Sequence, residues 1–160
     1  MRPEELEARV RQHQAGVLLD TNVLLLYLAR KISPGYAEGW KRTPFTARHG
    51  DVLDLVVGVA HRLVTTPHVL AEASNLASEE VKRLLQVLVA TVEERTLEAR
   101  LVGKDPVFLR LGLADCGLLT MAGRHRRRPL IVTVDGPLTV ELERRKLPVL
   151  NLNHVVFPTA

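Results

Sequence analysis

Four acidic residues of this 160-residue chain occupy positions where carboxylate chemistry can be built. Asp20 and Asp135 each directly follow a short apolar segment, at the point where a parallel sheet places its ligands. Glu72 and Asp115 recur at helical spacing among apolar residues, so we expect both carboxylates to project from faces otherwise made for burial. An ionised carboxylate is costly to bury without a partner, and no Lys or Arg shares the helical face of Glu72. A divalent cation would meet that need.

The metal that suits these acids is a hard one. Mg²⁺ and Mn²⁺ prefer oxygen ligands, and carboxylates at the carboxyl edge of a parallel sheet hold such cations for phosphoester chemistry. The sequence therefore predicts metal-assisted hydrolysis, in which the four acids are both the catalytic residues and the metal ligands. The single cysteine, Cys116, and histidines without paired ligand spacing argue against a soft-metal site.

Each acid taken alone also has a structural interpretation. Asp20 can cap a helix, and Glu72 can join a salt bridge between helices. Asp115 can belong to an ion pair at the start or in the interior of a helix, and Asp135 can be the turn residue of Asp-Gly-Pro. The four acids together are harder to explain in this way, which favours the metal site.

Short and long apolar segments alternate along the chain and must position these acids. The short ones predict strands at residues 17–19, 62–65, 96–102, 130–134 and 148–152. The longer ones predict helices at residues 23–31, 51–61, 68–76, 78–94, 106–123 and 138–146. Thr66 followed by Pro67 is typical of a helix N-terminus, and residues 32–50 are expected to form an irregular excursion. This alternation predicts an α/β fold, a three-layer sandwich with a central, mostly parallel, five-stranded sheet.

Length and composition are those of one globular domain, which we expect to span residues 1–160 with a core at about 16–152. Hydrophobic residues make up 46% and charged residues 25%, which argues against a disordered chain. The apolar stretches at 17–28 and 52–60 are too short or too interrupted to span a bilayer, and residues 1–14 lack the apolar core of a secretory signal. We therefore expect a cytoplasmic protein without a membrane partner.

The segments around the four acids resemble those of the PIN-domain nucleases, including toxin-type members. The matching segments are residues 17–25 around Asp20, 65–73 around Glu72, 111–116 with Ala122 around Asp115, and 131–135 around Asp135. The resemblance covers residues 16–152 and implies a Mg²⁺- or Mn²⁺-dependent phosphodiesterase that cuts single-stranded or structured RNA. It also implies that Asp20, Glu72, Asp115 and Asp135 form an acidic tetrad, with Asn22 and Thr133 as auxiliary polar residues.

Asn22, Thr133 and the region 32–61 each allow a second interpretation. Asn22 can equally be an ordinary residue of a helical first turn, and Thr133 an ordinary β-branched strand residue. The region 32–61 looks longer than in compact toxin-type domains, which weakens the toxin interpretation.

The formal net charge of +4 is compatible with a polyanionic partner. The cationic residues expected nearest to the acids, and hence to bind RNA, are Arg42, Arg48, His68, Lys104 and Arg110. The basic run at 124–128 should lie at the opposite edge of the sheet, because the helix carrying Asp115 starts at the carboxyl edge and descends. A solvated structural role and a remote contact with RNA or a protein both remain open for this run.

The leading hypothesis is a divalent-metal-dependent endoribonuclease. Because the ribose 2′-hydroxyl is not the attacking group, the products should carry 5′-phosphate and 3′-hydroxyl ends. The cellular role resembles that of the toxin of a type II toxin–antitoxin pair, which implies an antitoxin protein as partner, and we expect a homodimer or higher oligomer. The alternative is a non-catalytic PIN-like module that binds RNA or protein through its basic surface. A haloacid-dehalogenase-type phosphatase is disfavoured, because Asn22 stands where that fold expects a second Asp.

Overall fold

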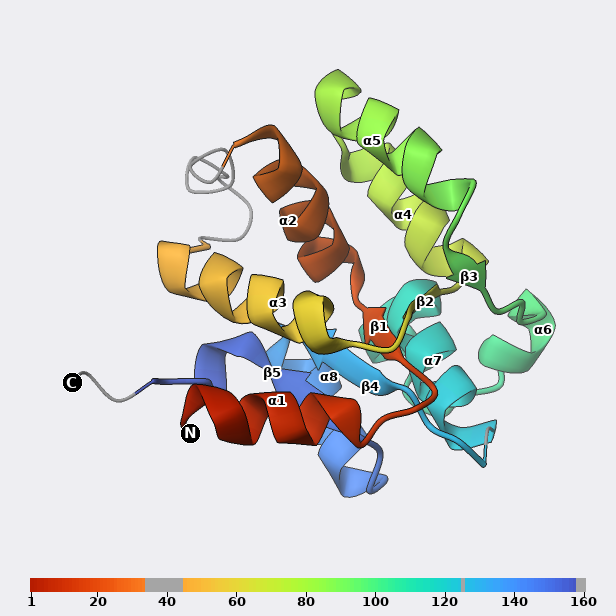
Figure 1. The fold of residues 1–160 in the computed structure, drawn as a ribbon. Coiled ribbons are helices and arrows are strands. Elements are labelled where there is room, and N and C mark those ends of the chain that lie inside the picture. The colour runs from red at the N-terminus through yellow and green to blue at the C-terminus, as the bar shows by residue number, and fades with distance from the viewer. Residues whose placement is uncertain (34–44, 125, 158–160) are drawn as a thin grey trace.

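Five parallel strands form the centre of the computed structural model, which describes residues 1–33, 45–124 and 126–157 (Figure 1). They are β1 (Val17–Leu19), β2 (Leu63–Thr65), β3 (Glu93–Glu94), β4 (Leu130–Thr133) and β5 (Val149–Asn151). The sheet order is β3-β2-β1-β4-β5, and every neighbouring pair is parallel. The α/β fold with a central five-stranded sheet is therefore confirmed.

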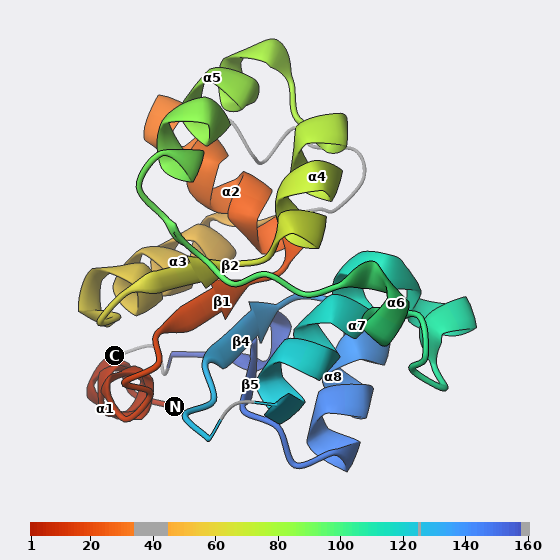
Figure 2. The ribbon, with the colours of Figure 1, turned by 90° about the vertical axis from the view of Figure 1, so that its right-hand side faces the viewer.

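Helices cover both faces of this sheet. They are α1 (Pro3–Arg11), α2 (Thr21–Ile32), α3 (Ala47–Val59), α4 (Pro67–Leu76), α5 (Glu79–Val89), α6 (Ala99–Val102), α7 (Phe108–Arg124) and α8 (Gly136–Arg144). A short 3₁₀ turn, η2 (Leu152–His154), follows β5. Figure 2 shows α1 and α3 on one side of the sheet and α7 and α8 on the other, with α2, α4 and α5 grouped beyond its end. This is the three-layer arrangement that the sequence predicts.

No helix within the three described ranges combines the length and apolarity that crossing a membrane requires.

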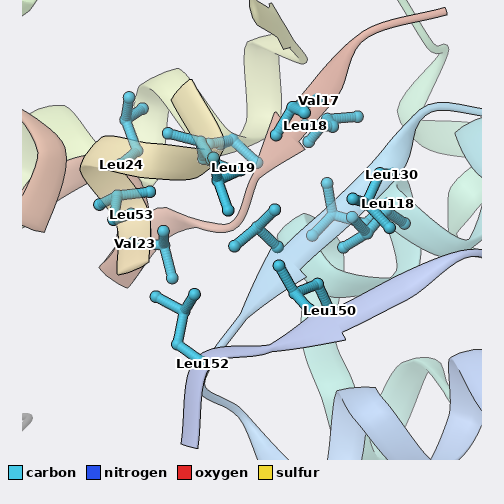
Figure 3. Packing of buried hydrophobic residues seen from close by; sticks show 14 of the residues in the cluster. Val17, Leu18, Leu19, Val23, Leu24, Leu53, Leu118, Leu130, Leu150 and Leu152 are labelled. Atoms are coloured by element: carbon cyan, nitrogen blue, oxygen red, sulfur yellow. The ribbon is translucent and has the colours of Figure 1, made fainter. Parts of the chain in front are cut away.

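The core lies between the sheet and its helices. The residues of β1 and β4 are buried throughout, as expected for parallel strands covered on both faces. Leu53 of α3 and Leu118 of α7 are fully buried and belong to the same hydrophobic cluster as these strands (Figure 3). The sites at the ends of these strands are therefore built directly onto the packed core.

Three strands lead directly into helices, and each junction carries a side-chain cap. Asp20, Thr66 and Asp135 are the N-caps of α2, α4 and α8, and each accepts a hydrogen bond from the backbone N–H three residues later. Pro67 occupies the first helical position of α4, as the sequence predicts. Because the strands are parallel, all three caps lie at the carboxyl edge of the sheet.

Two elements in the middle of the chain differ from the prediction. The helix expected to reach residue 94 ends at Val89, and the strand expected at 96–102 is replaced by β3 at Glu93–Glu94 and by α6. Of the apolar residues that suggested the strand, Val102 is buried, and it is buried from the helical turn of α6 instead. The polar β3 is tolerated because it lies at the edge of the sheet, where Glu93 pairs with Arg62 and Arg95.

The excursion predicted at residues 32–50 is shorter than expected at both ends. Helix α2 continues to Ile32, and α3 begins at Ala47, where the Thr46 backbone N–H donates to Nδ1 of His49 at 3.0 Å. Arg30 joins the two helices by pairing with Asp51 and Asp54 of α3. Residues 34–44, including Arg42, lie outside the described residues, so the RNA-binding role expected for Arg42 remains a prediction.

Candidate active site

One hydroxyl group joins two of the four acids. Oγ1 of Thr133 donates a hydrogen bond to Oδ2 of Asp20 and accepts one from the backbone N–H of Asp135 at 2.9 Å. The other oxygen of Asp20, Oδ1, accepts from the backbone N–H of Val23 at 2.8 Å. Thr133 thus ties the ends of β1 and β4 together and fixes the orientation of the Asp20 carboxylate, as an auxiliary site residue would.

Asp20 is buried, with 3% of its surface exposed. Burial raises its pKa to about 6, and the nearby charge of Asp135 adds to this effect. The hydrogen bonds from Thr133 and Val23 act in the opposite direction, because they stabilise the ionised form. The helix-cap interpretation of Asp20 is correct, and the carboxylate faces a second acid as well.

Asp115 lies beyond a break in its helix. Gly112 has φ 80° and ψ −175°, a left-handed conformation that favours glycine and that separates the first turn of α7 from its straight part. Leu111 is therefore not on the helical face that carries Asp115, contrary to the periodicity in the sequence.

The pKa of Asp115 is raised to about 7. Burial is the largest cause, followed by the charges of Asp20, Asp135 and Glu72. The charges of three acids from three other segments therefore act on Asp115, and all of them are negative.

Glu72 is exposed, which corrects the expectation that it projects from a buried face. Helix α4 buries Val69 and Ala73, and Glu72 lies beside that stripe rather than within it. Its Oε2 accepts a hydrogen bond from Oγ1 of Thr21 at 3.0 Å, across 51 residues of sequence. Thr21 was not among the predicted site residues, although it directly follows Asp20 in the first turn of α2.

A pocket of about 360 Å³ opens between α4 and α7, next to these acids. Its lining includes Glu72, Asp115 and His68, with Leu111 and Leu113 supplying apolar wall. The imidazole of His68 packs against Gly117, where a Cβ would lie 3.2 Å from the ring carbon Cδ2. The sequence singled out His68 as a nearby residue, and the structure places it in the pocket wall.

Three other predicted site residues, Asn22, Arg48 and Lys104, make no hydrogen bond to the four acids in the described part of the chain. Asn22 is half-buried in the first turn of α2, and its side chain makes no hydrogen bond to any residue that the structure describes. Arg48 is exposed in the first turn of α3, and Lys104 is exposed between α6 and α7. Their roles in binding RNA remain predictions.

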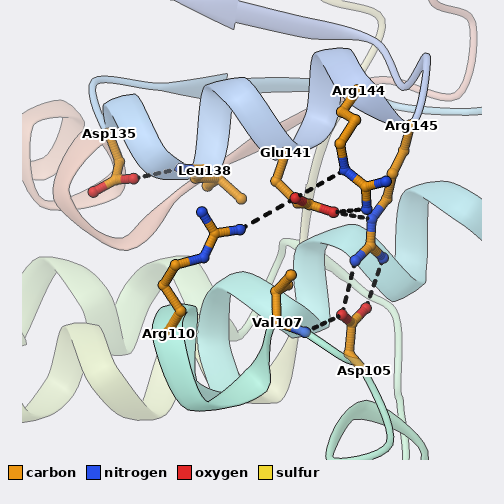
Figure 4. A network of polar contacts seen from close by, with 8 residues as sticks. All are labelled: Asp105, Val107, Arg110, Asp135, Leu138, Glu141, Arg144 and Arg145. Atoms are coloured by element: carbon orange, nitrogen blue, oxygen red, sulfur yellow. Dashed lines mark hydrogen bonds and ion pairs between the residues drawn. The ribbon is translucent and has the colours of Figure 1, made fainter.

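Arg110 belongs to an ion-pair network between α7 and α8 (Figure 4). Glu141 is buried to 3% exposure and pairs with Arg110 at 3.2 Å, with Arg144 at 2.6 Å and with Arg145 at 2.6 Å. Arg145 also binds both carboxylate oxygens of Asp105, at 2.7 and 2.8 Å. The guanidinium of Arg110 thereby contacts α8, the helix whose N-cap is Asp135, and about half of the Arg110 side chain is exposed.

Side chains from α8, the end of β5 and η2 support the backbone around Asp135. Nδ2 of Asn153 donates to the carbonyl oxygen of Val134 at 2.9 Å, and Oγ1 of Thr139 donates to that of Asp135 at 2.6 Å. Asn151 donates in turn to Oγ1 of Thr139 at 2.8 Å. Sequence reasoning missed Asn151 and Asn153, since the pairing of β4 with β5 brings them to this region.

The donor set suits Mg²⁺ or Mn²⁺, because it consists of carboxylate oxygens whose mutual repulsion a cation would relieve. Across residues 1–33, 45–124 and 126–157, however, no three His, Cys, Asp or Glu side chains are arranged closely enough to hold a metal ion. The carboxylates are thus within range of one another's charge without forming a closed ligand shell.

Comparison with models of known protein families gives no match, and comparison with curated protein sequences gives none either.

Proposed function

We propose that this chain is a divalent-metal-dependent endoribonuclease of the PIN-domain type, which hydrolyses RNA phosphodiester bonds. The observation that carries the proposal is the electrostatic convergence of Asp20, Glu72, Asp115 and Asp135 at one edge of the sheet. Such a concentration of carboxylates is costly in a structural role, because each negative charge destabilises the others.

Two threonine side chains position two of the four acids. Thr133 orients Asp20, and Thr21 holds Glu72 toward the same region from α4. The pKa of Asp115 is raised further than that of Asp20, so a bound cation would stabilise the ionised form of Asp115 more. Mg²⁺ or Mn²⁺ held by these acids would activate a water molecule and stabilise the charge that develops on the phosphate.

The pocket between α4 and α7 offers a place for a nucleotide next to the cleavage site. His68 and the leucines of its wall present aromatic and apolar surface, on which an RNA base can stack or pack. Arg110, Lys104 and Arg48 are the predicted phosphate contacts, and Arg110 is the one whose guanidinium the structure holds in a fixed place.

The test is cleavage of single-stranded RNA with Mn²⁺ or Mg²⁺ and with excess EDTA. Asp20→Asn retains an N-cap acceptor but removes the charge, and we expect it to abolish the metal-dependent cleavage of the wild-type protein. Glu143→Gln is the matched control, because Glu143 is exposed near the far end of α8. Equal cleavage by wild type in EDTA would refute the proposal. End analysis should find 5′-phosphates and 3′-hydroxyls.

The cellular role that the resemblance implies is that of a toxin in a type II toxin–antitoxin pair, acting as a homodimer or higher oligomer in the cytoplasm. A small neighbouring reading frame for a DNA-binding protein that inhibits the nuclease would support this role. The second candidate function is non-catalytic RNA binding, which the basic segment before β4 favours. A protein that binds RNA but does not cleave it with any divalent metal would have this function.

A further inference from the structure

The arginines of this protein differ in how their charge is balanced. Arg30, Arg62, Arg95 and Arg145, for example, pair with Asp or Glu. In contrast, the arginines between the end of α7 and the start of β4 have no carboxylate within ion-pair distance in the described part of the chain; they are Arg124, Arg126, Arg127 and Arg128. Uncompensated positive charge is therefore concentrated in this short segment.

Three of these arginines line a pocket of about 290 Å³ at the amino-terminal edge of the sheet. Its walls come from residues that precede three neighbouring strands: 12–15 before β1, 126–128 before β4, and Pro148 before β5. No Asp or Glu contributes to the described lining, whereas Gln12 and Gln14 add amide groups that can donate hydrogen bonds. The pocket is thus suited to an anion.

The loops that form this pocket are tied to each other. Nδ1 of His13 lies 3.4 Å from the carbonyl oxygen of Arg128, and Nη1 of Arg128 donates to the carbonyl oxygen of Lys146 at 3.2 Å. Arg126 and Arg127 are exposed and make no such contacts with the described residues. Among the residues that the structure describes, Arg126 and Arg127 therefore have free guanidinium groups, and the residue that follows them, Arg128, is tied to the segments before β1 and β5.

We propose that this pocket is a second RNA-binding site, which holds the phosphate backbone at a distance from the four acids. Guanidinium groups bind phosphate oxygens through paired hydrogen bonds, and such contacts add affinity without reading the base sequence. The identification of the polyanion as RNA rests on the proposed function, whereas the preference for a phosphate-rich ligand rests on the pocket itself.

The length of the RNA should decide whether both sites are occupied. Ala15 and Asp20 lie before and after β1, so the two sites are separated by about 17 Å at about 3.3 Å per residue. At a rise of about 3.4 Å per nucleotide, an RNA needs at least about five nucleotides to cover this distance, and more to follow the surface. A very short RNA can contact only one of the two sites.

The test measures RNA binding in EDTA by fluorescence anisotropy, at several salt concentrations, with oligonucleotides of about 20 and about 4 nucleotides. The variant is Arg126→Gln with Arg127→Gln. The control is Arg83→Gln with Arg100→Gln, which removes the same charge from exposed arginines that pair with Glu79 and Glu98. We expect the Arg126/Arg127 variant to bind the long RNA about tenfold more weakly, with a log–log salt slope reduced by about 1.4. The control should change the affinity less than about twofold, and the short RNA should lose less affinity than the long one.

Two outcomes would overturn the proposal. If both variants weaken RNA binding equally, the effect comes from net charge and not from the pocket. If the Arg126/Arg127 variant binds the long RNA as tightly as wild type, the pocket does not bind RNA and would suit another ligand, such as an acidic protein segment. Binding in EDTA does not depend on cleavage, so the two proposals can fail separately. A protein that binds long RNA but gives no metal-dependent products would refute the nuclease proposal alone.

Discussion

The hydroxyl of Thr133 donates a hydrogen bond to the carboxylate of Asp20 from the neighbouring strand, across 113 residues of sequence. The same oxygen accepts from the backbone of Asp135, so one fully buried side chain connects the first and last acids of the cluster. A valine of similar shape cannot make either contact, which makes the role of this residue testable.

Thr133→Val should destabilise the protein by about 1 to 3 kcal/mol, because a buried carboxylate and a backbone N–H lose their partner. The substitution should also raise the pKa of Asp20 further, since the hydrogen bond from Thr133 lowers it. Urea denaturation and single-turnover cleavage provide the measurements. Thr133→Ser keeps the hydroxyl and should retain most activity, whereas equal activity of the Val and Ser variants would exclude a positioning role.

Asp115→Asn should stabilise the metal-free protein by about 1 to 2 kcal/mol while abolishing cleavage, because it removes a charge that burial and three acids disfavour. Mn²⁺ should stabilise the wild type more than the variant, which would reverse the order of the melting temperatures. Asp105→Asn is the contrasting control: it removes the partner of Arg145 and should lower stability with or without metal. A lower melting temperature for metal-free Asp115→Asn, without a response to Mn²⁺, would remove Asp115 from the site.

The stability of the metal-free protein should fall as the pH rises from about 4 to about 7. Asp115 has a folded-state pKa of about 7 against its ordinary value of 3.8, so within this range the native state binds a proton that the unfolded state has lost. Asp20, with a folded-state pKa of about 6, acts in the same direction. Chemical denaturation at a series of pH values should show this slope, and Asp115→Asn should flatten it. A wild-type stability that rises between pH 5 and about 8 would contradict the raised pKa values.

The contribution of Glu141 to stability should depend on pH in the opposite direction to that of Asp115 and should be lost in acid. Arg144 and Arg145 lower its pKa from 4.5 to about 2, so its stabilising contribution is complete above about pH 4.5 and is lost as the pH falls through about 2. Glu141→Gln should destabilise the protein at neutral pH by about 1 to 3 kcal/mol, a value that allows for solvent screening of the exposed arginine partners. Glu143→Gln, on the exposed side of the same helix, should have little effect, and similar losses from both variants would argue against the network.

The local features of this protein can be predicted from its amino-acid sequence. The alternation of short and long apolar segments predicts the α/β fold and most of its elements, because strand and helix periodicity are properties of a few adjacent residues. The caps at Asp20 and Thr66 were predictable for the same reason, since a cap contacts the backbone only three residues away. The short edge strand at Glu93–Glu94 was not, because its formation depends on pairing with β2.

How the acids come together, and which side chains orient them, depends on contacts between residues far apart in the sequence. The contact of Thr21 with Glu72 spans 51 residues and that of Thr133 with Asp20 spans 113, so no local pattern carries either one. The break at Gly112 separates Leu111 from the helical segment that bears Asp115, and burial is the largest cause of the raised pKa of Asp115. Charge and solvent exposure are properties of the packed molecule, because they depend on every element that surrounds a group.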